Sequence, residues 1–333
     1  MEKSNAMRSG GLMEYERNLR IKKFCINYAL YALVIVLLIV YAVLAPDTFL
    51  TAANMKGLLV NASPLLIVSI GMTFVLLTGE IDLSVGSIAS VCAMVWMVSI
   101  TKLGMPIFAA TVLSILLGAL LGAVNAVLIT KLKINSFLVT LGMQTLLRGA
   151  TYLIDESRIL TTEPIKKFVG SSILGIPSLI FISVALIVVM ALIYKFTPFG
   201  RRVQAVGCNR KAAAKVGIHV PKTVALSFVL CGLFAGIAGL VQVANVGQAI
   251  PADIGDGMEF LSITAVVLGG TSLFGGVGTL IPGTLVGVYF YQAIENGLGV
   301  LGVTPYLYPV VKGIVIYLAM VTDSLKRSMR NAS

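Results

Sequence analysis

The chain has 333 residues, of which 58% are hydrophobic and 12% are charged, and its formal net charge is +11. A water-soluble domain carries roughly 25% charged residues, so this chain has too little polar surface to cover a soluble globule of its size. The excess apolar surface therefore faces a bilayer, and the strict apolar–polar alternation of a β-barrel is missing. The basic residues gather at the ends of apolar runs without interleaved aromatic residues, which argues against a nucleic-acid partner.

The uncharged runs predict an all-α integral membrane protein with about ten transmembrane helices. Each run is close to the roughly 20 residues that an α-helix needs to cross the hydrocarbon core. The predicted spans are residues 25–45, 58–79, 83–102, 107–130, 135–154, 177–196, 222–245, 258–275, 277–300 and 306–323. The first run is too long for the apolar core of a signal peptide, so we expect it to be a membrane helix.

Basic residues in short loops mark the cytoplasmic side of a membrane protein. They predict a cytoplasmic N-terminal segment (1–23), one transmembrane domain (24–323) and a cytoplasmic C-terminal tail (324–333). The loop 197–221 contains basic residues and no acidic residue, which is the strongest cytoplasmic signal in the chain. The loops 155–167 and 253–259 carry acidic residues and are predicted to lie on the opposite side.

The first polar segment within the apolar runs extends from Leu77 to Ser87 and contains Glu80 and Asp82. A carboxylate at membrane depth is costly and usually functional, and glycines beside it would let a helix break. Alternatively, the segment is an interfacial turn in which Asp82 and Ser84 cap the next helix. From the residues alone, both interpretations stay open.

A second segment, residues 266–276, has the same skeleton. Its glycines and leucine match those of the first segment at one constant offset: Gly79, Leu83 and Gly86 correspond to Gly269, Leu273 and Gly276. Paired glycine-interrupted helices point toward a central translocation site, although glycine-rich helices also simply pack closely. The uncharged stretch 260–294 is too short for two full helices of ~20 residues, so at least one helix there is predicted to be short or broken.

The third segment is the basic loop from Phe199 to Ile218, where an alanine run between glycines predicts a short helix on the cytoplasmic face. Its charges could serve only topology or anionic lipid, but we favour a protein partner. Two further cations, Arg148 and Lys312, interrupt apolar spans. A lone cation can snorkel to the interface, whereas Lys312 lies midway along its span and is expected to face a cavity or a carboxylate.

Four cysteines and one histidine offer few sites for metal or redox chemistry. The cysteines (Cys25, Cys92, Cys208 and Cys231) have no CxxC spacing, and we interpret them as small packing residues. The phosphate-binding pattern G-x-x-x-x-G-K-S/T is missing, so a nucleotide would have to bind to another chain. We therefore expect no cofactor and no metal on this chain.

Together these segments resemble the ribose-type permease subunits of bacterial ATP-binding-cassette (ABC) sugar importers, a family of binding-protein-dependent inner-membrane components. The resemblance rests on residues 78–87, 135–149, 199–218, 265–276 and 296–312, in order along nearly the whole chain from Thr48 to Asp323. There are departures from the family pattern. Glu80 stands where glycine is frequent, Arg210 and Lys211 replace an often acidic pair, and Leu261 stands where aspartate is common.

The resemblance implies a transporter subunit, not an enzyme, in the bacterial cytoplasmic (inner) membrane. Its expected partners are a periplasmic sugar-binding protein, a second permease subunit that is identical or paralogous, and a separate ATP-binding subunit that carries ATP and Mg²⁺. The loops 155–167 and 253–259 would receive the binding protein. The basic loop would couple to the ATPase through Gly200, Arg201, Arg202, Ala205, Gly207, Asn209, Ala213 and Gly217.

The resemblance places the pore near the two glycine motifs but names no sugar contacts. Because an uncharged polyol needs hydrogen-bonding groups in an apolar tunnel, we expect a path lined by Thr78, Asp82, Asn125, Gln144, Thr264, Thr271 and Asn296. Structural or gating roles are expected for Gly79, Gly86, Gly269, Gly270, Gly275, Gly276, Arg148 and Lys312.

The substrate expected from the resemblance is ribose or another monosaccharide, and a nucleoside or a sugar-derived signalling molecule stays open. The main alternative function is a proton-coupled carrier that uses Glu80 or Asp82. The Gly-flanked basic loop and the lack of several carboxylates deep in the predicted helices argue against it. An intramembrane enzyme is disfavoured because His219 falls in a cytoplasmic loop and metal ligands are too few.

Overall fold

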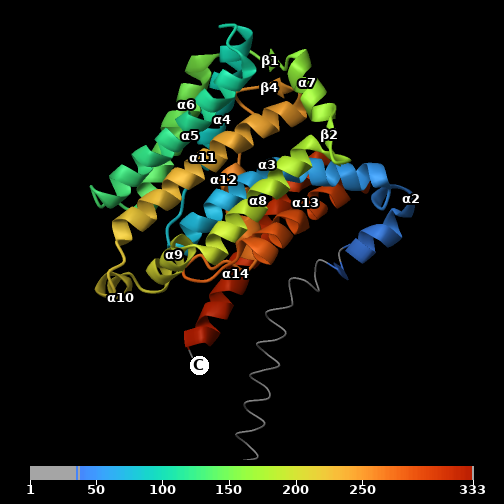
Figure 1. The fold of residues 1–333 in the computed structure, drawn as a ribbon. Helices are drawn as coiled ribbons and strands as arrows, with labels where there is room; N and C mark the ends of the chain where they lie inside the picture. The colour runs from blue at the N-terminus through green and yellow to red at the C-terminus, as the bar shows by residue number, and fades with distance from the viewer. Residues whose placement is uncertain (1–34, 37, 332–333) are drawn as a thin grey trace, which may run out of the picture.

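The computed structural model describes residues 35–36 and 38–331, which form an almost entirely helical bundle (Figure 1). The predicted N-terminal segment 1–23 and most of the first predicted span lie outside the described residues. The helices are α2 (Pro46–Phe49), α3 (Ala52–Leu77), α4 (Val85–Thr101), α5 (Ile107–Thr130), α6 (Ser136–Ile154), α7 (Glu163–Gly170), α8 (Ser178–Phe196), α9 (Pro198–Cys208), α10 (Arg210–Lys215), α11 (Val220–Val246), α12 (Met258–Leu268), α13 (Leu285–Val300) and α14 (Tyr308–Asn331).

Five of these helices are long and apolar enough to cross a membrane: α3, α5, α6, α8 and α11. They match the predicted spans closely, and α5 has the predicted bounds. The helices α4 and α12 are apolar but shorter. The described part of the chain is thus an all-α, multi-pass membrane protein, because α-helices of about 20 apolar residues are the elements that span a bilayer.

The predicted span 258–275 is wrong at its end. The helix α12 stops at Leu268 after 11 residues, and Gly270 follows with a φ of +92°, a conformation that ends a helix and that glycine adopts without strain. A π-turn (η1, Leu280–Thr284) then leads into α13. The expectation of a short or broken helix in this region is therefore confirmed, and the break coincides with the glycine motif.

The core lies along α3 and α11. In its most apolar window, 83% of α3 is buried, and 67% of α11. The corresponding fractions for α5, α6 and α8 are 33%, 22% and 28%, so these helices keep a broad apolar face outward. A helix that is apolar all round belongs in the interior, whereas the outward faces of α5, α6 and α8 suit a hydrocarbon environment.

Glycines set the distance between α5 and α11. A Cβ at Gly118 would lie 2.5 Å from the carbonyl oxygen of Gly232, and a Cβ at Gly232 would lie 2.8 Å from Cα of Gly122. The two helices therefore touch backbone to backbone. Small residues at this spacing are the usual means of packing membrane helices, where burial of apolar surface no longer drives association.

The two ends of the bundle carry different small elements (Figure 1). At one end, the strand β1 (Ile159–Leu160) pairs antiparallel with β4 (Gln248–Ala249), next to α7, and β2 (Ser172–Ile173) pairs with β3 (Ile176–Pro177). At the other end lie α9 and α10. The short strands were not predicted, because two-residue ladders have no period of their own in the sequence. A 3-10 turn (η2, Pro305–Leu307) precedes α14, which continues past the predicted span to Asn331.

Candidate functional site

The three sequence motifs meet at the end of the bundle that carries α9 and α10. The amide of Gly276 donates to the carbonyl oxygen of Leu77, with an N···O distance of 2.9 Å. A Cβ on Gly207 would overlap both the Leu77 oxygen and the Gly276 amide. The end of α3, the loop after α12 and the end of α9 are thus in direct backbone contact, which only glycine at position 207 allows.

Two glycines at positions that do not correspond in the predicted repeat, Gly79 and Gly276, serve this contact. Gly79 has a φ of +75° and packs against the carbonyl of Phe274, while Gly276 has a φ of +77° and packs against Cys208. Both lie in the left-handed region that other residues avoid. The two segments are therefore in contact, but the matched glycines do not share a conformation: Gly269, the counterpart of Gly79, has a φ of −67°, and Gly86, the counterpart of Gly276, lies within α4.

The helix α10 is held on the bundle by its first residues. The side chain of Asn209 accepts from the Ala212 amide (3.0 Å) and caps the helix, and Ala213 is buried beneath it. A φ of +83° at Gly217 ends the turn that follows. The predicted short helix in the basic loop is confirmed, as two helices (α9 and α10) rather than one.

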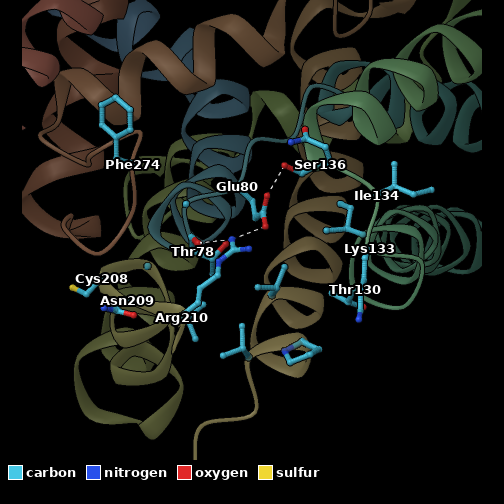
Figure 2. Close-up of a pocket in the computed structure, with 18 residues that line it drawn as sticks. Thr78, Glu80, Thr130, Lys133, Ile134, Ser136, Cys208, Asn209, Arg210 and Phe274 are labelled. Atoms are coloured by element: carbon cyan, nitrogen blue, oxygen red, sulfur yellow. Dashed lines mark hydrogen bonds and ion pairs between the residues drawn. The ribbon is translucent and has the colours of Figure 1, made fainter. Parts of the chain in front are cut away.

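An ion pair ties α10 to the turn after α3 (Figure 2). Arg210 Nη2 donates to Glu80 Oε1 (2.5 Å) and to the carbonyl oxygen of Thr78 (3.1 Å). The other carboxylate oxygen, Glu80 Oε2, accepts from Ser136 Oγ (2.5 Å), at the start of α6. Glu80 therefore links three elements. Its side chain is 12% exposed and that of Arg210 is 47% exposed, so the pair is partly screened by solvent.

A cleft of about 650 Å³ opens beside this ion pair (Figure 2). Its walls come from the end of α3, the end of α5, the start of α6, α9–α10 and the start of α11. Polar side chains including Thr130, Lys133 and Asn135 contribute to its lining. Of the predicted path residues, only Thr78 lies here.

The residues predicted for coupling fall into two groups. Gly200, Ala205, Gly207 and Ala213 lie in part or fully inside, and a Cβ at Gly200 would overlap the Tyr194 backbone. Arg201, Arg202, Asn209 and Gly217 are exposed, as are Lys211, Lys215 and Val216. The side chain of Val216 is 76% exposed. The first group fixes the two helices, and the second forms a basic outer surface with one apolar residue that could bind a partner.

A second polar cluster lies where α4 and α12 begin. Gln144 Nε2 donates to Glu259 Oε1 (2.6 Å), and Ser87 Oγ donates to the carbonyl oxygen of Gln144 (2.8 Å). Gly86 leaves room for Glu259 and for the backbone of Gly255. Glu259 is only 3% exposed. Glu259 was predicted to mark the loop 253–259, but it lies in the first turn of α12 and is buried, whereas Asp253 and Asp256 are exposed.

Arg148 belongs to the same cluster. Its Nη1 donates to the carbonyl oxygen of Ile254 (2.8 Å) and, at 3.5 Å, to that of Pro251 and to Ser90 Oγ. It thereby holds the segment before α12 against α4 and α6. Arg148 thus has polar partners inside the bundle, which a lone cation reaching for the interface would not need.

The position of this cluster follows from α6. Gln144 lies roughly 12 Å along the axis from Ser136, at 1.5 Å per residue. The N-termini of α4 and α12 therefore meet part of the way through the bundle and not at its end. Discontinuous helices that begin at such a depth are the usual setting of substrate sites in membrane transporters.

The predicted path residue Asp82 is fully buried in the turn before α4. Asp82 Oδ1 accepts from Ser84 N (2.9 Å) and Ser84 Oγ (2.6 Å), and Asn125 Nδ2 donates to Ser84 Oγ (2.8 Å). These bonds form a turn before α4, but the expected helix cap is missing, because the N-cap residue Ser84 makes no side-chain capping bond and Asp82 accepts from Ser84 rather than from an amide of α4. Asp82 Oδ2 and Asn125 Oδ1 have no hydrogen-bond partner among the residues that the structure describes.

The remaining candidates lie apart. Thr264 donates to the carbonyl of Phe260 within α12, and Thr271 is buried against Gly278. Asn296 exchanges two hydrogen bonds with Asn54 (2.9 and 3.0 Å) and joins α13 to α3. The seven predicted path residues thus fall into separate groups and do not form one continuous lining. Within residues 35–36 and 38–331, no group of three His, Cys, Asp or Glu side chains could hold a metal ion.

Lys312 pairs with a carboxylate, which is one of the two surroundings (a cavity or a carboxylate) predicted for it. Lys312 Nζ lies 3.0 Å from Glu295 Oε1, so α14 is paired to α13. Sequence reasoning missed two other features, the Glu80–Arg210 pair and the burial of Glu259. The signal for the first was present, since two positions that depart from the family pattern carry opposite charges.

Known proteins match the chain over most of its length. A family model described as the permease component of the branched-chain amino acid transport system matches residues 54–320. Ribose import permease protein RbsC of Haemophilus influenzae is 34% identical, covering 92% of this chain and 96% of the relative. RbsC of Bacillus subtilis is 38% identical, covering 87% and 90%. The L-arabinose ABC transporter permease protein AraH of Azospirillum brasilense is 34% identical, covering 90% and 89%.

No solved structure matches the chain significantly. The family match spans more than half of the chain and the relatives exceed 30% identity over nearly all of it, so the similarity is not confined to one motif. These relatives are permease subunits of importers, not enzymes. The chain therefore belongs to the family of the permease component of the branched-chain amino acid transport system, and it is a multi-pass transporter subunit.

Proposed function

We propose that the chain is the membrane-spanning permease subunit of an ABC importer for a monosaccharide, ribose-like or a related pentose. The observation that carries this proposal is the similarity over about nine-tenths of the chain to permeases named for ribose and for L-arabinose. A nucleoside or a sugar-derived signalling molecule would share the same ring chemistry and is the alternative substrate within this function.

The proposed topology has about ten spans, with both termini in the cytoplasm of a bacterial cell and the domain in its inner membrane. The basic, exposed surface of α9 and α10 supports this orientation, because positive loops stay on the cytoplasmic side. The α7 end would then face the periplasm. Its exposed Asp253 and Asp256, together with the loop that carries β1 and α7, would receive a sugar-binding protein.

The proposed partner at the α9–α10 surface is the ATP-binding subunit, which would carry ATP and Mg²⁺. A second permease subunit, identical or paralogous, would complete the path. Arg201 of α9, Lys211 of α10 and Val216 after α10 offer two exposed cations and one exposed apolar side chain. Interfaces of this kind combine an apolar centre with a polar rim. The cleft beside Arg210 would admit a side chain of the partner.

The proposed mechanism is alternating access driven by that partner. A push on α10 would reach the turn after α3 through Arg210 and Glu80, and the start of α6 through Ser136. It would reach α12 through the contact of Gly207 with Gly276. Packed helices respond to such a push by switching between two arrangements rather than deforming continuously. The sugar would pass near the start of α4 and α12, where Gln144 and Glu259 offer polar atoms.

The rival function is a proton-coupled carrier that uses Glu80 or Asp82. Glu80 is already paired with Arg210 and accepts from Ser136, which suits a structural link better than a proton site. If the chain were a proton-coupled carrier, uptake would collapse with an uncoupler at constant ATP, whereas uptake through an ABC importer would continue.

The test begins with affinity purification of the tagged chain from its native membrane and mass spectrometry of the proteins that accompany it. The docking variant is Val216→Asp, which changes an exposed residue of the α10 turn without filling the core. The matched control is Leu174→Asp, which is 90% exposed in the turn between β2 and β3. We expect an ATP-binding subunit with the wild type and the control, and much less with Val216→Asp.

Substrate identity is tested on the purified complex in proteoliposomes. Labelled ribose, L-arabinose, a nucleoside and a branched-chain amino acid are offered in turn with the cognate binding protein. Uptake of a sugar that requires ATP supports the proposal. Copurification of no ATPase with the wild type, or uptake that depends only on a proton gradient, would refute it.

A further inference from the structure

An apolar groove of about 560 Å³ lies between α5 and α8, where residues of α7 and α11 also line it. Its base includes Trp96 and Leu240, which are 5% and 6% exposed. Its sides include Ile115 of α5 and Leu186 of α8, and Ile165 of α7 closes one end. The volume is within the roughly 300–1,000 Å³ of ligand pockets in general.

The groove offers almost no polar atoms to a ligand. Its polar side chains are Trp96 and Thr111, and they bond to each other: Trp96 Nε1 donates to Thr111 Oγ1 (3.0 Å). Thr111 Oγ1 in turn donates to the carbonyl of Ile107 (2.8 Å). A sugar in this groove would lose its bonds to water and gain none, so the groove is unsuited to the transported solute.

The two helices that flank the groove also carry exposed apolar side chains. On α5, Leu116 and Leu120 are 61% and 60% exposed, and on α8, Val189 and Leu192 are both 51% exposed. In a membrane protein these outward faces contact lipid chains. The groove is therefore continuous with a hydrocarbon environment, and an empty groove would forfeit dispersion contacts along its whole lining.

The helix α7 lies across one end of the groove with two different faces. Ile165 is 4% exposed and Phe168 stands at the rim, whereas Glu163, Lys166 and Lys167 are exposed. Lys166 pairs with Glu163 (2.8 Å), so α7 carries one more positive than negative charge. A short amphipathic helix of this kind lies in the interface plane, and its lysines attract anionic headgroups.

We propose that the groove binds an acyl chain of an anionic phospholipid from the leaflet on the α7 side, with the headgroup beside the lysines of α7. The acyl chain fills the space between α5 and α8 and packs against the buried side of α7. This lipid site is separate from the path of the sugar, and it does not depend on which solute the permease carries.

The sequence supplies a direct probe, since Trp96 is the only tryptophan of the chain. Because Trp96 is 5% exposed, a lipid chain must enter the groove to touch it. The full-length protein is reconstituted in vesicles that contain phosphatidylglycerol or phosphatidylcholine with brominated acyl chains, which quench tryptophan on contact. We expect quenching in the wild type, at a lower fraction of brominated phosphatidylglycerol than of brominated phosphatidylcholine.

The groove is then narrowed with Ile115→Phe, and the matched control is Leu116→Phe, the next residue of α5 and an exposed one. We expect quenching to fall by about twofold or more in Ile115→Phe and to be unchanged in the control, because the added ring takes up space in the groove alone. Leu186→Phe, from the facing wall, gives the same reduction and guards against misfolding of one variant. Lys167→Gln is expected to weaken the preference for phosphatidylglycerol.

Three results overturn the proposal. Equal quenching in Ile115→Phe, Leu186→Phe and Leu116→Phe would mean that bulk lipid reaches Trp96 by another route. No quenching in the wild type would mean that protein, such as a second copy of the chain, seals the groove. Equal quenching by the two brominated lipids in the wild type would refute the choice of an anionic headgroup.

Discussion

The two ends of the bundle hold their small helices by different forces. The α9–α10 end relies on directional contacts: the Glu80–Arg210 pair, the bond from Gly276 to Leu77 and the backbone contact at Gly207. At the other end, α7 is held by the buried side chain of Ile165 and by a hydrogen bond from Ser178 Oγ to the carbonyl oxygen of Phe168 (2.7 Å), beside the two-residue β1–β4 ladder. Directional contacts fix the position of a helix against its neighbours. A displacement of α10 is therefore transmitted to the end of α3 and to the loop after α12. The apolar part of the α7 contact has no preferred direction, so α7 has more freedom to adjust than α10.

The largest expected effect is at Gly207. The variant Gly207→Val places a branched side chain where a single Cβ already overlaps the backbone of Leu77 and Gly276. We expect a loss of more than about 4 kcal/mol in stability, at the exceptional end for single substitutions. Thermal unfolding in detergent measures it. The control Gly149→Ala has open space around its Cβ and is expected to unfold at the wild-type temperature or above.

Next in size is the apolar contact of α7. Ile165→Ala removes a side chain that is 4% exposed, with an expected cost of about 2 kcal/mol, at the low end for buried large-to-small changes because the groove beside it can relax. Phe168→Ala, from a residue that is 44% exposed, should cost less. Hydrogen exchange of the α7 amides checks this. Equal protection in both variants would show that the β1–β4 ladder, not Ile165, holds this end.

The ion pair should matter less for stability and more for coupling. A double-mutant cycle with Glu80→Gln and Arg210→Gln is expected to give a coupling energy of about 1 kcal/mol, since Arg210 is half exposed and salt screens the pair. Substrate-stimulated ATPase activity of the complex should fall in either single variant more than stability does. The interpretation of Glu80 as a mechanical link fails if ATPase stimulation is unchanged in both.

The smallest effect concerns pH at the α7 end. The hydrogen bond from Lys102 and those from Ser157 lower the pKa of Asp155 from 3.8 to about 2. Because the pKa is lower in the folded state, this stabilisation is complete above pH 3.8 and is lost as pH falls through about 2. Lys102→Gln removes the strongest cause of the lowered pKa of Asp155. The wild type and this variant should therefore differ slightly in unfolding temperature near neutral pH, and the difference should vanish in acid. A constant difference across this range would assign the effect to packing.

The sequence by itself determined the long helices of this protein. A bilayer demands about 20 apolar residues per crossing, and that demand is visible as uncharged runs, so the predicted span 107–130 has the bounds of α5. The charge pattern also identified the basic loop, and it predicted that Lys312 faces a cavity or a carboxylate, because a charge within an apolar run is costly unless it has a polar partner. The three motifs that proved to be in contact were also recognisable one by one.

Only the tertiary structure decided how these motifs meet. Arg210 and Glu80 are 130 positions apart, and their pairing depends on how α9 and α10 fold back onto α3. The burial of Glu259 likewise follows from the short α12, which starts inside the bundle beside Gln144. Hydropathy reports how a segment partitions between water and lipid, and it carries no information on which segments touch. Contacts between distant segments are set by close packing, which the glycines at positions 207 and 276 permit here.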